Sequence, residues 1–126
     1  MRSIWLRLMV ALAMLLALAS PVPAQRAAGR MPSVGVLWGG PITLAKPYLT
    51  AGLETLRELG WVEGQNITIE YRFAPPTATT QAERRAALTT NAEDLARVKV
   101  DVIVAAADPA VEAARRATST IPIVMF

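Results

Sequence analysis

The stretch Val100–Ala107 (VDVIVAAA), followed at once by Asp108 and Pro109, decides the fold. After Asp101 it is almost wholly apolar, which is typical of a central parallel strand that is covered on both faces. An Asp-Pro pair directly after such a run favours a helix start, with Asp108 as the N-cap and Pro109 as the first helical residue. The stretch therefore predicts a buried strand that passes directly into a helix.

The same alternation of strand and helix extends from this stretch in both directions. Strands are predicted at Ser33–Trp38, Asn66–Phe73 and Ile121–Phe126, and helices at 46–59, 81–99 and 110–117. This order predicts an α/β fold with a parallel sheet, right-handed crossovers and helices on both faces. The strict alternation of Asn66–Phe73 indicates a strand near a sheet edge.

Local signals refine two of the predicted helices. Pro47 suits a first helical turn, and Gly60 suits the residue after the helix end. In the second helix, Thr89-Thr90-Asn91 interrupts the pattern, and Thr90 with Glu93 is a candidate capping box. One kinked helix and two shorter helices both fit this segment.

The N-terminal segment Met1–Ala24 has the three parts of a secretory signal peptide: a basic start, the apolar run Leu8–Ala19 and small residues before a cleavage point. The run is too short for the ~20 residues of a membrane-spanning helix. A buried N-terminal helix and a retained anchor remain the alternatives. We expect a mature chain from Gln25, periplasmic and without stable membrane insertion, with a flexible lead-in over 25–32 and an α/β lobe over 33–126.

Composition excludes several classes of function. The chain has 13 Lys+Arg and 10 Asp+Glu, and removal of Arg2 and Arg7 with the signal peptide leaves a net charge near +1. The basic residues are not clustered among aromatics, so nucleic acid is not an expected partner. Because Cys and His are both absent, Cys/His zinc sites and His-dependent nucleophilic triads are excluded within this chain. We expect no cofactor, no metal and no catalytic residue. Phe126 falls in or directly after a buried-looking strand, so we also expect a truncated chain.

Four segments together resemble the substrate-binding proteins of ABC transporters, in particular those related to tryptophan and tyrosine uptake receptors. They are Leu53–Asn66 (LETLRELGWVEGQN), Ile69–Arg72 (IEYR), Val100–Val104 (VDVIV) and Ala117–Val124 (ATSTIPIV). The resemblance implies a receptor with two α/β lobes of the flavodoxin-like, periplasmic-binding-protein type, which closes on a small ligand and delivers it to an inner-membrane permease. This chain would supply most of the first lobe.

The chain departs from that family in two places. The segment between Arg72 and Val100 is longer than usual and carries additional Thr and Arg residues. Position 108 is Asp, where the family more often has Thr or another small polar residue. The first departure is interpreted as a loop insertion, and the second bears on the ligand.

Candidate site residues follow from the rule that ligands of open parallel sheets bind beyond the carboxyl ends of the strands. Those ends are predicted at Trp38–Pro41, Ala74–Pro76 and Ala106–Pro109. The candidate ligand-binding residues are Trp38, Gly39, Gly40, Ala106, Ala107 and Asp108.

Each candidate has a purely structural alternative. The glycines could form only a turn, and Trp38 could stack on a ligand or cover the sheet edge. Asp108 could hold the amine of a ligand or serve only as an N-cap. The charged residues of the helices, Arg84 and Arg85 among them, are interpreted as solvated faces.

The function that the sequence favours is solute capture for an ABC transporter, with an amino acid or an amine among the candidate ligands. The alternatives are a sensor domain of the same fold and a flavodoxin-like enzyme with active residues beyond this chain.

Overall fold

Four short parallel strands form the centre of the molecule in a computed structural model that describes residues 29–126. They are β1 (Ser33–Trp38), β2 (Thr68–Phe73), β3 (Val102–Ala105) and β4 (Ile123–Met125), in the order β2-β1-β3-β4. This is the flavodoxin-like order over its first four strands. The predicted α/β fold with a parallel sheet is confirmed, as is the predicted edge position of β2. The predicted signal peptide lies outside the described residues.

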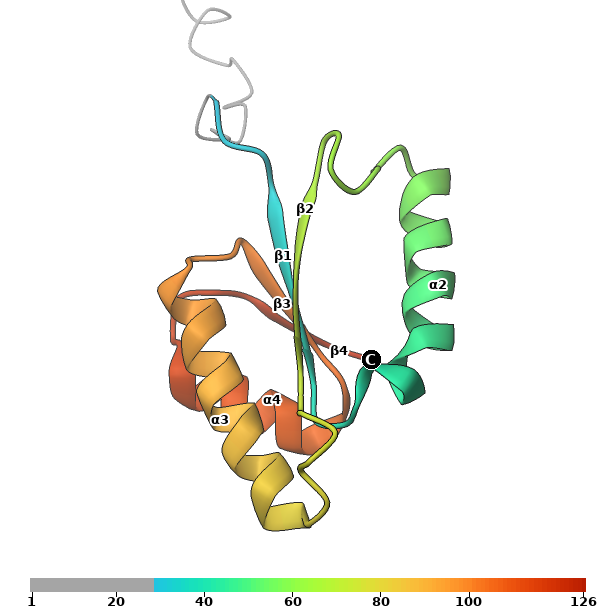
Figure 1. The fold of residues 1–126 in the computed structure, drawn as a ribbon. Helices are drawn as coiled ribbons and strands as arrows, with labels where there is room; N and C mark the ends of the chain where they lie inside the picture. Colours follow the sequence, from blue (N-terminus) through green and yellow to red (C-terminus); the bar gives the residue numbers. More distant parts are fainter. Residues whose placement is uncertain (1–28) are drawn as a thin grey trace, which may run out of the picture. The chain divides into compact units, whose positions relative to one another are not determined.

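Three helices cover the two faces of the sheet unequally (Figure 1). They are α2 (Ile42–Glu58), α3 (Gln81–Arg97) and α4 (Ala107–Ala117). Helices α3 and α4 pack against each other on one face, and α2 lies alone on the other. No helix among residues 29–126 has the length and apolar character to cross a membrane.

The hydrophobic core lies on the face that α3 and α4 cover. Its members are Leu37, Leu88, Ala92, Leu95, Val100, Ile103, Ala105, Ala110, Ala113 and Ala114. Gly35 in β1 allows α3 to approach, since a Cβ at this position would lie 2.8 Å from Cδ2 of Leu95. Gly39, directly after β1, approaches Leu88 of α3 in the same way, so the two glycines allow α3 to lie close to the strand.

The face that α2 covers is much less closed. A cavity of about 400 Å³ separates α2 from the sheet, with Val36, Ile69 and Val104 on the sheet side and Leu49 and Leu53 on the helix side. Val36 is buried, whereas Leu49, Leu53, Ile69 and Val104 are only half-buried. The leucine spacing of α2 therefore marks its inward face correctly, but this face is only partly packed.

Helix α2 begins earlier than the sequence pattern predicts. It starts at Ile42, so Pro47 lies inside the helix and not in its first turn. The ring nitrogen of Pro47 cannot donate the usual bond to the carbonyl four residues back, and the helix tolerates this loss. The predicted stop at Gly60 is confirmed: its φ is +87°, and Gly60 N and Trp61 N donate to the carbonyl oxygens of Arg57 and Leu56 at 3.0 and 2.8 Å. This is a Schellman motif.

Helix α3 is one continuous helix with its capping box at Thr80 and Glu83. The candidate box at Thr90 and Glu93 does not form, because both residues lie inside the continuous helix. Of its neighbours, Thr89 Oγ1 donates back to Arg85 O at 3.1 Å and Asn91 Nδ2 donates to Phe73 O at 3.0 Å. These bonds occupy the polar side chains that suggested an interruption. The helix therefore continues through them.

Helix α4 also starts differently from the prediction. Its N-cap is Ala106, with no side-chain capping bond, and Asp108 lies in the first turn. Asp108 as the N-cap is wrong, since a capping side chain belongs to the residue before the helix, where the backbone is extended. Arg115 and Arg116 lie in the last turn, as predicted.

Candidate functional site

The carboxyl ends of the neighbouring strands β1 and β3 lie at the point where the strand order reverses. From β1 the chain moves to β2 on one side, and β3 then pairs with β1 on the other side. Open α/β sheets bind ligands in the crevice outside such a switch point. A cavity of about 320 Å³ lies there.

Five of the six predicted ligand-binding residues line this cavity: Trp38, Gly39, Gly40, Ala106 and Ala107. The remaining lining comes from Pro109 of α4 and from Gln81, Arg84, Arg85 and Leu88 of α3. The predicted strand end at Ala74–Pro76 is not part of the lining. The strand-end rule therefore located the cavity, and the structure adds one face of α3 to it.

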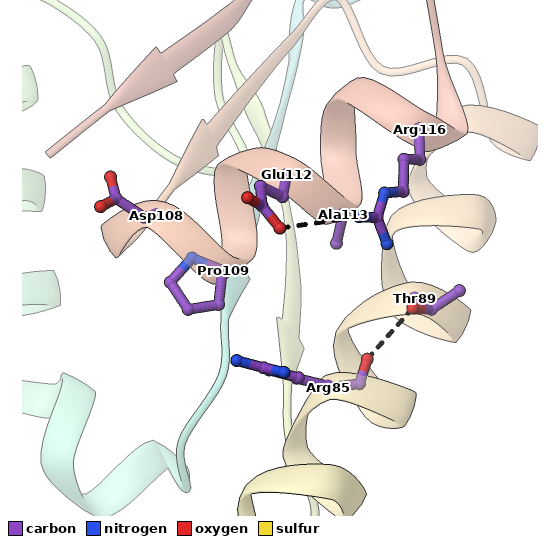
Figure 2. A pocket seen from close by; sticks show the side chains of 7 residues that line it. All are labelled: Arg85, Thr89, Asp108, Pro109, Glu112, Ala113 and Arg116. Atoms are coloured by element: carbon purple, nitrogen blue, oxygen red, sulfur yellow. Dashed lines mark hydrogen bonds and ion pairs between the residues drawn. The ribbon is translucent and has the colours of Figure 1, made fainter.

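Asp108, the sixth predicted residue, lines a second cavity of about 300 Å³ on the other side of Pro109. Figure 2 shows its carboxylate directed away from α3 and from the Arg85 guanidinium. In the same cavity, Glu112 and Arg116 form an ion pair at 3.7 Å. A role for Asp108 in holding an amine stays a prediction, and it concerns this second cavity.

The α3 face that lines the switch-point cavity is defined by helical spacing. Gln81, Arg84, Arg85 and Leu88 follow at intervals of three, one and three residues, which places them along one side of a helix. Arg84 Nε donates to Ala78 O at 3.2 Å, which fixes the base of that guanidinium. The Arg85 side chain extends from α3 towards Pro109 (Figure 2).

The two glycines of the β1–α2 loop allow close packing around the cavity. A Cβ at Gly39 would lie 3.0 Å from Cδ1 of Leu88, and a Cβ at Gly40 would lie 2.8 Å from Nε1 of Trp38. Neither glycine has a positive φ. Their role here is therefore space for Leu88 and the Trp38 indole, not an unusual backbone conformation.

Trp38 takes part in an aromatic cluster at the edge of the cavity. Its ring centroid lies 5.6 Å from that of Tyr48 in α2 and 6.0 Å from that of Phe126. Tyr48 remains 62% exposed. Trp38 thus both lines the cavity and packs on neighbouring rings, and its stacking on a ligand stays a prediction.

Backbone amides around the cavity differ in whether they have an acceptor. Ala106 N donates to Leu37 O at 3.0 Å, and Ala107 N donates to Phe126 O at 3.4 Å. Within residues 29–126, no backbone carbonyl or side chain accepts from the amides of Gly39 and Gly40. Ala107 has a φ of +64°, a left-handed conformation that is costly for a residue with a Cβ.

Two acidic groups near α3 have lowered pKa values, and neither belongs to the cavity. The backbone amide of Thr80, with the Thr80 hydroxyl and the Thr79 amide, lowers the pKa of Glu83. The side-chain hydrogen bond from Arg72 Nε, 2.7 Å from Oδ2, lowers the pKa of Asp94, and Arg97 also pairs with Asp94. Burial next to Glu63 raises the pKa of Tyr71 to about 12. These shifts have structural causes.

Sequence reasoning missed Gln81, Arg84, Arg85 and Leu88 as lining residues, whereas Pro109 fell in a predicted strand end but was not among the candidate ligand contacts. The signal was present, because a helix that follows a parallel strand begins at the carboxyl edge of the sheet. The first two turns of the helix after β2 therefore start beside Trp38, and their one-sided spacing selects the residues that face the cavity. Reading the arginines only as solvated charges overlooked this.

The larger cavity under α2 is a weaker ligand site. Its lining is almost entirely apolar, and the Tyr71 hydroxyl already donates to Glu63 Oε2 at 3.1 Å. Ligand sites combine apolar walls with a few polar groups that orient the ligand. The switch-point cavity has both, in the arginines and glycine amides beside Trp38, Leu88 and Pro109.

In the part of the chain that the structure describes, no three acidic side chains gather as metal ligands. No protein-family model, curated protein or solved structure matches this sequence. The geometry of the cavity therefore carries the functional argument, together with the resemblance described above.

Proposed function

We propose that the protein is the exported solute-binding component of an ABC transporter, and that the switch-point cavity is its half of the ligand site. In this proposal Met1–Ala24 directs export to the periplasm, and residues 33–126 form the first lobe. Binding occurs by closure of two lobes around a small molecule, which an inner-membrane permease then takes over. No chemical conversion of the ligand is involved.

One observation carries the proposal: the cavity lies at the switch point of a flavodoxin-like sheet, and five of the six ligand-binding residues predicted from the sequence line it. The lining offers hydrogen-bond donors and apolar surface. It contains no carboxylate, His or Cys for acid–base or nucleophilic chemistry. A binding role fits this lining better than an enzymatic one.

The test is solute uptake together with binding. The purified full chain is screened against small molecules by thermal shift, and each hit is recovered and checked for chemical change. We expect reversible, saturable binding of an unchanged solute, and loss of uptake of that solute from source cells that lack the gene. Turnover of the bound compound would favour the flavodoxin-like enzyme. Binding with normal uptake would favour the sensor domain.

A separate measurement tests the export part of the proposal. Mass spectrometry of the protein from the periplasmic fraction should give an N-terminus at Gln25. An intact Met1 in the membrane fraction would instead indicate a retained anchor.

A further inference from the structure

Arg84 and Arg85 of α3 differ from Arg72, Arg97 and Arg116 in having no acidic partner among residues 29–126, as is also the case for Arg57 and Arg115 outside the cavity. Arg72 and Arg97 pair with Asp94, and Arg116 pairs with Glu112. Among residues 29–126, no carboxylate lies within ion-pair distance of Arg84 or Arg85. Both line the switch-point cavity.

No acidic side chain lines the switch-point cavity, so Arg84 and Arg85 are the charged groups of its lining. Arg85 also lines the adjoining cavity, which contains Asp108 and Glu112. There Asp108 is directed away from α3, and Glu112 is paired with Arg116 (Figure 2). Two guanidinium groups at one cavity wall favour an anionic group and oppose a cationic one. The excess of positive charge thus indicates the sign of the ligand.

The rest of the lining indicates what the anionic group is attached to. Leu88, Pro109 and the indole of Trp38 make most of the wall apolar. A volume of about 320 Å³ is near the lower end of the roughly 300–1,000 Å³ that small-molecule sites occupy. An inorganic anion would leave this apolar surface unused, whereas a small acid with a flat apolar body would cover it.

We propose that the cavity binds a small organic acid, with its carboxylate at Arg84 and Arg85 and its apolar body against Trp38, Leu88 and Pro109. This inference rests on the proposed function, because it names the ligand class of the same site. The bond from Arg84 Nε to Ala78 O leaves the terminal nitrogens of that guanidinium for the ligand. The amides of Gly39 and Gly40 are further donors in the same wall.

The experiment compares acids with their neutral analogues on the full chain. Benzoate, phenylacetate and indole-3-acetate are titrated beside their primary amides and beside inorganic phosphate, by ligand-observed NMR. We expect at least one acid to bind about tenfold more tightly than its amide, since a charge-assisted hydrogen bond is worth about 1.5–3 kcal/mol. Added salt should weaken binding of the acid and leave binding of the amide unchanged.

Variants assign the preference to the two arginines. In the double variant Arg84→Gln/Arg85→Gln, the affinity for the acid should fall to the affinity for its amide. The matched control is Arg57→Gln/Arg115→Gln, which removes the same charge from exposed positions outside the cavity and should keep the preference. Equal loss in both double variants would mean an effect of net charge only, and would overturn the inference.

The other outcomes are also decisive. If no acid binds more tightly than its amide, or if phosphate binds as well as the acids, the organic-acid inference is wrong. If a neutral or cationic solute binds saturably while the acids do not, the proposed solute-binding function stands and only its ligand class changes. If no solute of the wider screen binds, the proposed function itself fails.

Discussion

The two ends of the parallel sheet are built in different ways. At the amino end, side chains tie the loops down: Asp101 Oδ2 accepts from Ser33 N at 2.7 Å and from Ser33 Oγ at 3.0 Å. Asn66 Nδ2 donates to Gly60 O, and Asn66 Oδ1 accepts from Val62 N, both at 2.7 Å.

At the carboxyl end, the same strands lead to a cavity. Arg84 and Arg85 have no acidic partner there within residues 29–126, and Ala107 has a left-handed backbone. At the amino end the polar side chains form hydrogen bonds within the protein. At the carboxyl end several polar groups remain available to bind a ligand. The proposed binding role of the carboxyl end rests on this difference.

The largest expected effect comes from the core that holds α3 on the sheet. Leu95 is fully buried, and its side chain lies directly over Gly35. Leu95→Ala should lower the free energy of unfolding by about 2–5 kcal/mol, through lost burial and a residual cavity. Urea titration followed by circular dichroism measures this. A similar loss in Leu53→Ala, on the partly packed α2 face, would contradict the unequal packing of the two sheet faces.

The next effect separates the two ends directly. Asn66→Ala removes two hydrogen bonds that close the loop between α2 and β2, and should lower the free energy of unfolding by about 1–2 kcal/mol. Solute affinity should remain within twofold of the unchanged protein. If affinity falls with stability, the amino end also contributes to binding and the comparison fails.

A smaller effect is expected from relieving the backbone at Ala107. The left-handed conformation costs a non-glycine residue about 1–2 kcal/mol, and the greater freedom of glycine in the unfolded chain offsets about 0.4–1 kcal/mol. Ala107→Gly should therefore raise the free energy of unfolding by about 0.5–1 kcal/mol and weaken solute binding. Lys99, with a φ of +57° at the amino end, provides the control: Lys99→Gly should leave affinity unchanged.

The smallest effect is a pH dependence of stability from the two carboxylates of α3. Hydrogen bonds lower the pKa of Glu83 at the carboxyl end and of Asp94 towards the amino end. Below about pH 4 the unfolded chain binds more protons than the folded one at these groups, so their contribution is present above that pH and is lost as pH falls further. Glu83→Gln and Asp94→Asn should each flatten the acid limb of a stability–pH curve, and an unchanged limb in both would refute the assignment.

The sequence predicted the elements whose patterns are local and strong. The apolar run around Ile103 predicted the central strand, the alternation around Tyr71 predicted the edge strand, and Gly60 predicted the end of α2. The strand-end rule then placed Trp38, Gly39, Gly40, Ala106 and Ala107 around one cavity.

The wrong predictions concern features that tertiary contacts determine. The capping box lies at Thr80 and not at Thr90, because α3 continues through Thr90. The neighbouring Asn91 side chain donates to Phe73 O. Asp108 is separated from the cavity because α4 begins one residue before it. The α3 arginines were interpreted only as solvated charges, although the start of α3 after β2 and the one-sided spacing of Arg84 and Arg85 place them beside the cavity.

The most direct test of the account is an amide-resolved NMR titration of the full chain with a solute that binds. We predict chemical-shift changes at Trp38, Gly39, Gly40, Ala106 and Ala107, with saturation at one affinity, and none at Ser33, Gly60 or Asn66. Changes centred on the amino-end residues, or on α2 and the apolar cavity beneath it, would contradict the claim that the carboxyl end of the sheet is the binding site.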